Sequence, residues 1–214
     1  MVGEMRVLVF GDSITQGFWD VEGGWVSRIR RAYDQKAIET DGYDQPAIFN
    51  MGVSGDSSDD VLARFNNETK VRANDELAFV FAIGVNDART KAGINYSDTN
   101  RYKQNLVEIL KAANKHSNKV LFVGLTPCVQ ERSNPVSWGD SGYTNGRIKE
   151  FDDTLRQFCE DVQVPYVEVF EPFSKAETES ELLPDSLHPN DEGHQLIADL
   201  VMPKLQNLLR SEDQ

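Results

Sequence analysis

The chain has 214 residues, and its 22 basic and 35 acidic residues give it a formal net charge of −13 at pH 7. Because no basic cluster is dense enough to follow a phosphate backbone, the charge argues against nucleic-acid binding and against attachment to an anionic membrane. The length suits one generous domain with a sizeable core, and we expect residues 1–214 to form a single domain.

Apolar runs typical of buried strands alternate with amphipathic stretches along the chain. The runs predict strands at 7–10, 47–49, 77–83, 119–125 and 166–170. Apolar residues at helical spacing predict helices around 25–33, 58–65, 99–113, 143–161 and 196–209. We expect Pro203 to kink or break the last of these helices. Strands and helices that alternate in this way predict a doubly wound parallel sheet covered on both faces.

The first predicted strand leads into a polar turn that contains Ser13. In open α/β sheets, ligands bind at the carboxyl ends of the strands, and a serine there lies beside the N–H groups of a strand-to-helix turn. Ser13 is therefore our candidate nucleophile. The tripeptide Gly-Asp-Ser recurs at 55–57 and 139–141, but neither copy follows an apolar run, and we interpret the second as loop.

A serine hydroxyl needs a neutral imidazole to accept its proton, and the chain has three histidines. His116 ends a predicted helix among lysines and is expected to be solvated. His194 lies one turn into the last helix, where packing or a hydrogen bond is the expected role. His188 lies on a loop three residues after Asp185, a spacing that lets the carboxylate hold Nδ1 and leave Nε2 free for Ser13.

The oxyanion of a tetrahedral intermediate needs preorganised donors, each contributing on the order of 3–4 kcal/mol. The N–H groups of Ser13 and Gly52 and the side-chain amide of Asn86 follow the first three strands and could supply them. A plain turn glycine and an Asx turn are the alternatives for Gly52 and Asn86. Asp12 and Asp87 are expected to organise their loops by hydrogen bonding, and neither is assigned a catalytic step.

Four sequence blocks occur in a fixed order between residues 11 and 189. They are Gly11-Asp12-Ser13-Ile14-Thr15, Asn50-x-Gly52-x-Ser54-Gly55, Gly84-x-Asn86-Asp87 and Asp185-x-x-His188-Pro189. Together these blocks resemble the GDSL esterase/lipase family, also called SGNH hydrolases. One letter departs from the family name, since Ile14 stands where leucine would be, which is a conservative change.

The resemblance implies an α/β fold, a three-layer α/β/α sandwich with a flavodoxin-like parallel sheet of about five strands. It also implies a serine hydrolase without a cofactor, with Ser13 as nucleophile, His188 as base and Asp185 as its partner. The family's oxyanion role carries over to Ser13, Gly52 and Asn86.

The expected reaction is hydrolysis of a small-molecule carboxylic ester through an acyl-Ser13 intermediate. The same groups would serve an acyltransferase, a thioesterase or a lysophospholipase, and a non-catalytic module that binds an acyl or sugar ligand is the remaining alternative. No G-x-S-x-G occurs, so the nucleophile elbow of α/β-hydrolases is not expected.

Four aromatic residues lie in or beside loops that could rim the site, namely Phe18, Trp19, Trp138 and Tyr143. We take Trp19 and Trp138 as candidate substrate-binding residues. An aromatic rim suits small acyl, aryl and acetylated-sugar esters about equally, and each ring could instead cover core. The polar loop 130–141 is the best candidate lid.

The cysteine pattern and the hydropathy of the chain limit its other properties. Cys128 and Cys159 are not in a Cys-x-x-Cys pair, so neither a disulfide framework nor a metal site is expected. No apolar run reaches transmembrane length, and the first residues lack the apolar segment of a signal peptide. We therefore expect a cytoplasmic protein without an integral membrane segment, and the sequence does not indicate an oligomeric state.

Overall fold

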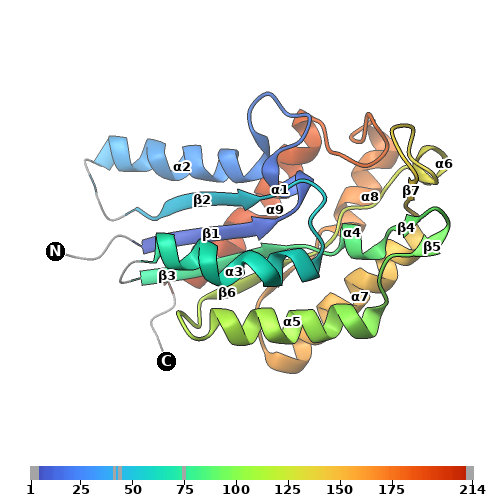
Figure 1. Ribbon diagram of the computed structural model, residues 1–214. Helices are drawn as coiled ribbons and strands as arrows, with labels where there is room; N and C mark the ends of the chain where they lie inside the picture. Colours follow the sequence, from blue (N-terminus) through green and yellow to red (C-terminus); the bar gives the residue numbers. More distant parts are fainter. Residues whose placement is uncertain (1–4, 41, 43–44, 74–75, 211–214) are drawn as a thin grey trace.

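The computed structural model describes residues 5–40, 42, 45–73 and 76–210. Within these residues, five strands form a central sheet in the order β2-β1-β3-β6-β8, and every neighbouring pair is parallel (Figure 1). The strands are β1 (Met5–Gly11), β2 (Ala47–Gly52), β3 (Glu76–Ala82), β6 (Val120–Val123) and β8 (Tyr166–Val167). The predicted fold, a flavodoxin-like α/β/α sandwich, is confirmed.

Helices cover both faces of the sheet. On one face α2 and α9 pack against each other, and α8 contacts α9; on the other face α3, α5 and α7 lie side by side (Figure 1). Their bounds are α2 (Gly24–Thr40), α3 (Ser58–Arg72), α5 (Thr99–Ala113), α7 (Asn145–Val162), α8 (Phe170–Glu179) and α9 (Asp191–Arg210). No helix among the described residues is long and apolar enough to span a bilayer.

Short elements gather at the carboxyl ends of the strands, and all but α1 lie on the right in Figure 1. They include three one-turn helices and a small antiparallel sheet of order β5-β4-β7. Their bounds are α1 (Ser13–Gln16), α4 (Val85–Ala88), α6 (Gln130–Ser133), β4 (Thr90–Lys91), β5 (Ile94–Asn95) and β7 (Ser141–Gly142). This is the edge of the sheet at which the sequence predicts the site.

An aromatic ladder runs across the centre of the sheet. Phe10 pairs with Phe81 in register and their rings stack at 5.7 Å, while Phe81 pairs with Phe122 and stacks on it at 5.3 Å. Phe65 of α3 packs on Phe10 at 5.1 Å. All four side chains are fully buried. Because cross-strand aromatic pairs add to the burial of apolar surface, the ladder fixes the register that aligns the strand ends.

Several predicted elements differ from the structure. The expected strand at 166–170 ends at Val167, and Phe170 begins helix α8, which the pattern does not predict. Helices α2 and α3 continue to Thr40 and Arg72, beyond the predicted ends near residues 33 and 65. Helix α9 runs unbroken through Pro203, so a break there is wrong. Buried Val201 and Leu205 anchor α9 on either side of the proline, and this packing offsets the lost backbone hydrogen bond.

Candidate active site

Ser13 begins the one-turn helix α1, directly after β1. The preceding residue, Asp12, caps this helix, because its carboxylate accepts the N–H of Ile14 at 2.9 Å. Burial raises the pKa of Asp12 to about 6, against the opposing effect of the Ile14 N–H. Gly17, with φ +94°, ends the turn in the left-handed region that favours glycine. The buried Ser13 therefore lies on a tightly defined turn at the carboxyl end of a central strand.

The loop before α9 brings an imidazole and a carboxylate to Ser13. Its Oγ lies 2.9 Å from His188 Nε2, and His188 Nδ1 lies 2.7 Å from Asp185 Oδ2. Asp185 Oδ1 accepts the N–H groups of Leu187 at 3.0 Å and His188 at 2.7 Å, which folds the loop around the carboxylate. Burial would raise the pKa of Asp185, but hydrogen bonds from the His188 side chain and these N–H groups outweigh it and lower that pKa.

Two exposed tryptophans flank this arrangement. Trp19 is 65% exposed, and its Nε1–H donates to Asp185 Oδ2 at 2.8 Å. The ring of Trp138, 51% exposed, lies 5.9 Å from the ring of His188. Tyr143, considered for the same rim, is only 5% exposed, which favours the alternative that its ring covers core. The hydrogen bond from Trp19 to Asp185 was not expected, since nothing in the sequence relates the two residues.

Asn86 lies in the one-turn helix α4, and both ends of its amide are engaged. Its Nδ2 donates to the carbonyl oxygen of Asp56 at 3.0 Å and lies 3.5 Å from Asp12 Oδ2. Its Oδ1 accepts the hydroxyl of Tyr143 at 2.9 Å and Nη1 of Arg89 at 3.2 Å. These contacts turn the amide nitrogen towards the turn that holds the nucleophile. Nothing in the sequence indicates these contacts of Tyr143 and Arg89 with the Asn86 amide.

Two glycines allow backbone to approach closely around the site. At Gly52, a Cβ would lie 2.3 Å from the backbone nitrogen of Gln16, so only glycine lets β2 end against α1. At Gly84, which has φ +140°, a Cβ would lie 2.5 Å from the hydroxyl of Tyr102. The N–H of Gly52 donates to Asn50 Oδ1 at 2.9 Å. The N–H of Gly52 is thus engaged by the Asn50 side chain, and a role for Gly52 in binding the oxyanion stays a prediction.

Most of the chain matches one known protein family. Residues 9–196 match the family model described as the GDSL-like lipase/acylhydrolase family. The chain belongs to this family. The resemblance stated from the four sequence blocks is thereby confirmed, and the protein is a hydrolase of the esterase or acylhydrolase type. The search among curated proteins gave no match.

Several solved structures share the fold. A lipase/acylhydrolase from Enterococcus faecalis is 22% identical, with a TM-score of 0.76 over 98% of this chain and 100% of its own. The acetylxylan esterase Axe2 from Geobacillus stearothermophilus is 17% identical, with a TM-score of 0.73 over 94% of this chain and 93% of its own. A lipolytic protein of the G-D-S-L family from Veillonella parvula is 18% identical, with a TM-score of 0.72 over 93% of this chain and 97% of its own.

The other candidate residues of this GDSL hydrolase have structural contacts. Asp87 accepts the N–H of Ser58 at 2.9 Å and joins α4 to the start of α3; burial raises its pKa to about 6. His194 is fully buried, and its Nε2 lies 3.4 Å from the carbonyl oxygen of Phe18; burial lowers its pKa to about 4. His116 is exposed beyond α5, as predicted.

An ion-pair cluster holds the 17–24 loop, which contains Trp19. The carboxylate of Asp20 accepts the N–H groups of Glu22 at 3.0 Å and Gly24 at 2.8 Å and pairs with Arg28. Arg28 also pairs with Asp191 at the start of α9. Burial would raise the pKa of Asp20, but the hydrogen bonds from Arg28 and the two N–H groups lower it to about 2. The loop is thus joined to the helix that follows His188.

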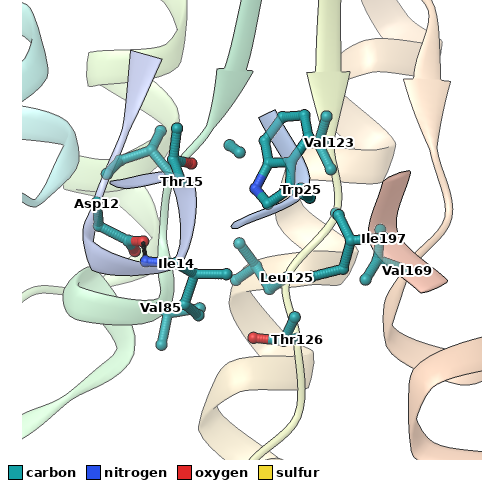
Figure 2. Close-up of a pocket in the computed structure, with 13 residues that line it drawn as sticks. Asp12, Ile14, Thr15, Trp25, Val85, Val123, Leu125, Thr126, Val169 and Ile197 are labelled. Atoms are coloured by element: carbon teal, nitrogen blue, oxygen red, sulfur yellow. Dashed lines mark hydrogen bonds between the residues drawn. The ribbon is translucent and has the colours of Figure 1, made fainter. Parts of the chain in front are cut away.

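A small cavity lies beside the turn that carries Asp12, Ile14 and Thr15 (Figure 2). Its volume of about 20 Å³ suits one or two water molecules. The hydroxyls of Thr15 and Thr126 on its wall have no hydrogen-bond partner among the described residues. The rest of the labelled wall is mostly apolar, including Ile14, Trp25, Val85, Val123, Leu125, Val169 and Ile197. The same described residues contain no group of three or more His, Cys, Asp or Glu that could hold a metal ion.

Proposed function

We propose that the protein is a serine esterase that hydrolyses carboxylic esters through an acyl-Ser13 intermediate. One observation supports this proposal above the others: Ser13 Oγ lies 2.9 Å from His188 Nε2, whose ring is held through Nδ1 by Asp185 at 2.7 Å. These distances suit a nucleophile, a general base and an orienting carboxylate.

In the proposed reaction, Ser13 Oγ forms a bond to the ester carbonyl carbon as its proton moves to His188 Nε2. The carbonyl π electrons move onto oxygen, and the tetrahedral intermediate collapses by releasing the alcohol, which takes the proton from His188. Water then attacks the acyl-enzyme by the same route and releases the carboxylic acid and free Ser13. Asp185 keeps Nδ1 protonated throughout and stabilises the imidazolium that forms.

For the oxyanion we propose the backbone N–H of Ser13 and Nδ2 of Asn86 as donors. One hydrogen of Nδ2 is used by the Asp56 carbonyl, and the second, whose nearest acceptor is Asp12 Oδ2 at 3.5 Å, is weakly engaged. Gly52 could contribute only by exchanging Asn50 Oδ1 for the oxyanion.

For the substrate we propose short-chain esters, including acetylated sugars, that bind between Trp19 and Trp138. Neither Ser13 nor His188 lines the small cavity beside the Asp12–Thr15 turn. The two indoles beside the proposed triad are exposed, so we place the substrate on their side. Exposed indole rings offer flat apolar faces for sugars or aryl groups. Several solved structures with this fold are named as acetylxylan esterases, which agrees with such a substrate.

The test combines a serine variant with a matched control. Ser13→Ala should lose hydrolysis of a chromogenic acetate ester and labelling by an organophosphonate, while Ser141→Ala, which alters another Gly-Asp-Ser copy, should keep both. Labelling and turnover that persist in Ser13→Ala would overturn the proposal. Product analysis with added alcohol separates hydrolysis from acyl transfer, and a panel of thioesters and lysophospholipids tests the remaining alternatives.

A further inference from the structure

The carboxylate of Asp185 receives a hydrogen bond that the proposed triad does not require. Its Oδ2 accepts from His188 Nδ1 at 2.7 Å and also from Trp19 Nε1 at 2.8 Å. Its Oδ1 is already engaged by the N–H groups of Leu187 and His188. The indole therefore competes directly with the imidazole for one carboxylate oxygen.

The conformation of Trp19 needs a compensating interaction. Its φ of +62° lies in the left-handed region, which disfavours residues with a large side chain. Burial does not account for this conformation, because the residue is 65% exposed. The ring contacts Phe18 at 4.5 Å, and Asp20, the next residue, is fixed by Arg28. The hydrogen bond from the Trp19 Nε1–H to Asp185 is the polar contact that compensates for this backbone conformation.

We propose that Trp19 is a positioning residue of the active site. Its indole N–H fixes the Asp185 carboxylate and weakens the hydrogen bond that this carboxylate accepts from His188 Nδ1. This inference rests on the proposed function, because it gives Trp19 an effect on the base. It assigns to Trp19 a role distinct from that of Trp138, which approaches His188 from the 130–141 loop without a hydrogen bond to Asp185 among those the structure describes.

The expected direction follows from the competition at Oδ2. Without the indole N–H, the carboxylate accepts more strongly from Nδ1 and stabilises the protonated imidazole, which is inactive as a base. Among the described residues, Asp12 from the β1–α1 turn and His194 from α9 also interact electrostatically with the His188 ring. Both remain in every variant tested, so a difference between variants reports on the indole.

The decisive experiment replaces the indole N–H with minimal change of shape. 3-Benzothienylalanine at position 19 has a sulfur atom in place of the N–H group, and Trp19→Phe is the genetic alternative. We expect the acid limb of kcat/KM on a chromogenic acetate ester to move to higher pH by about half a unit. Trp138→Phe is the matched control; it should change KM and leave the midpoint of the acid limb unchanged.

The outcomes separate this inference from the proposed function. If the wild type neither hydrolyses esters nor reacts with an organophosphonate, the proposed function fails. If the wild type is active and the acid limbs of the wild type and both position-19 variants coincide, the inference about Trp19 is wrong, even where kcat falls. A purely structural role for Trp19 would lower the active fraction or the melting temperature without moving the midpoint.

Discussion

Replacing Tyr143 by Phe removes one hydroxyl and tests how the amide of Asn86 is held. That hydroxyl donates to Asn86 Oδ1 at 2.9 Å, and the other donor to this oxygen is Arg89 Nη1 at 3.2 Å. Because Tyr143 is buried and its ring is retained in Phe, water does not easily replace the lost donor. A buried hydrogen bond of this kind contributes about 1 kcal/mol, which corresponds to roughly fivefold in rate if the amide acts only in the transition state.

The assay is steady-state hydrolysis of a chromogenic acetate ester. We expect kcat of Tyr143→Phe to fall roughly fivefold, with KM within about twofold, because the proposed donor acts on the oxyanion and not on the bound ester. Tyr166→Phe is a matched control: its hydroxyl donates to Asp152 at 2.8 Å, from β8 to α7. This variant should lose stability and keep kcat.

A double-mutant cycle decides whether the effect passes through Asn86. In an Asn86→Ala background, Tyr143→Phe should no longer lower kcat, because the amide that it orients is absent. If the hydroxyl costs the same factor with and without the amide, the reasoning is refuted, and Tyr143 affects the rate by another route.

The remaining predictions concern Ser13, Asn86, Gly52 and His194. Ser13→Ala should fold normally and lose about 10³-fold or more in turnover, measured with the same ester. Turnover of this variant at the wild-type rate would refute the assignment of Ser13 as the nucleophile. Asn86→Ala should lower kcat roughly 10²–10³-fold; an unchanged kcat would remove Asn86 from the oxyanion site. Gly52→Ala should lower the free energy of unfolding in urea by about 1–3 kcal/mol, because its Cβ would meet the Gln16 backbone at 2.3 Å; equal stability would contradict this close approach. His194→Gln should remove a pH dependence of the free energy of unfolding. Between the ordinary histidine pKa of 6.5 and the folded value of about 4, the unfolded chain binds a proton that the folded chain does not. Between pH 4 and pH 6.5, the stability of the wild type should therefore rise with pH relative to that of the variant. Parallel urea stabilities across this range would show that His194 does not titrate in this way.

Much of the fold follows from local sequence patterns. The unbroken apolar runs before Gly11 and Gly84 predict central strands because a parallel sheet buries both of its faces. Helix α8 was missed because Val167, Val169 and Phe170 continue a strand-like pattern, while the helix signals are confined to Glu171 and Pro172 in its first turn.

Local sequence signals predict some residues of the candidate site, but they do not predict its long-range contacts. Ser13, Asp185 and His188 could be placed together because each lies next to a recognisable strand end or turn. The contacts of Trp19 with Asp185 and of Tyr143 with Asn86 join residues 166 and 57 positions apart, and no periodicity encodes such pairs. That residues 1–214 form one domain and that the protein is cytoplasmic stay predictions.

The anchor of the 17–24 loop has a consequence for work in acid. Asp20 has a pKa of about 2, and its partner Arg28 keeps its positive charge at every pH at which the protein would be assayed. The ion pair therefore persists across the range near pH 6 in which imidazoles ordinarily take up a proton. Acidification to pH 5 should leave the tether between this loop and α9 in place, so a reversible fall in turnover there would reflect protonation of groups at the site, Asp12 and Asp87 among them, and not detachment of the loop.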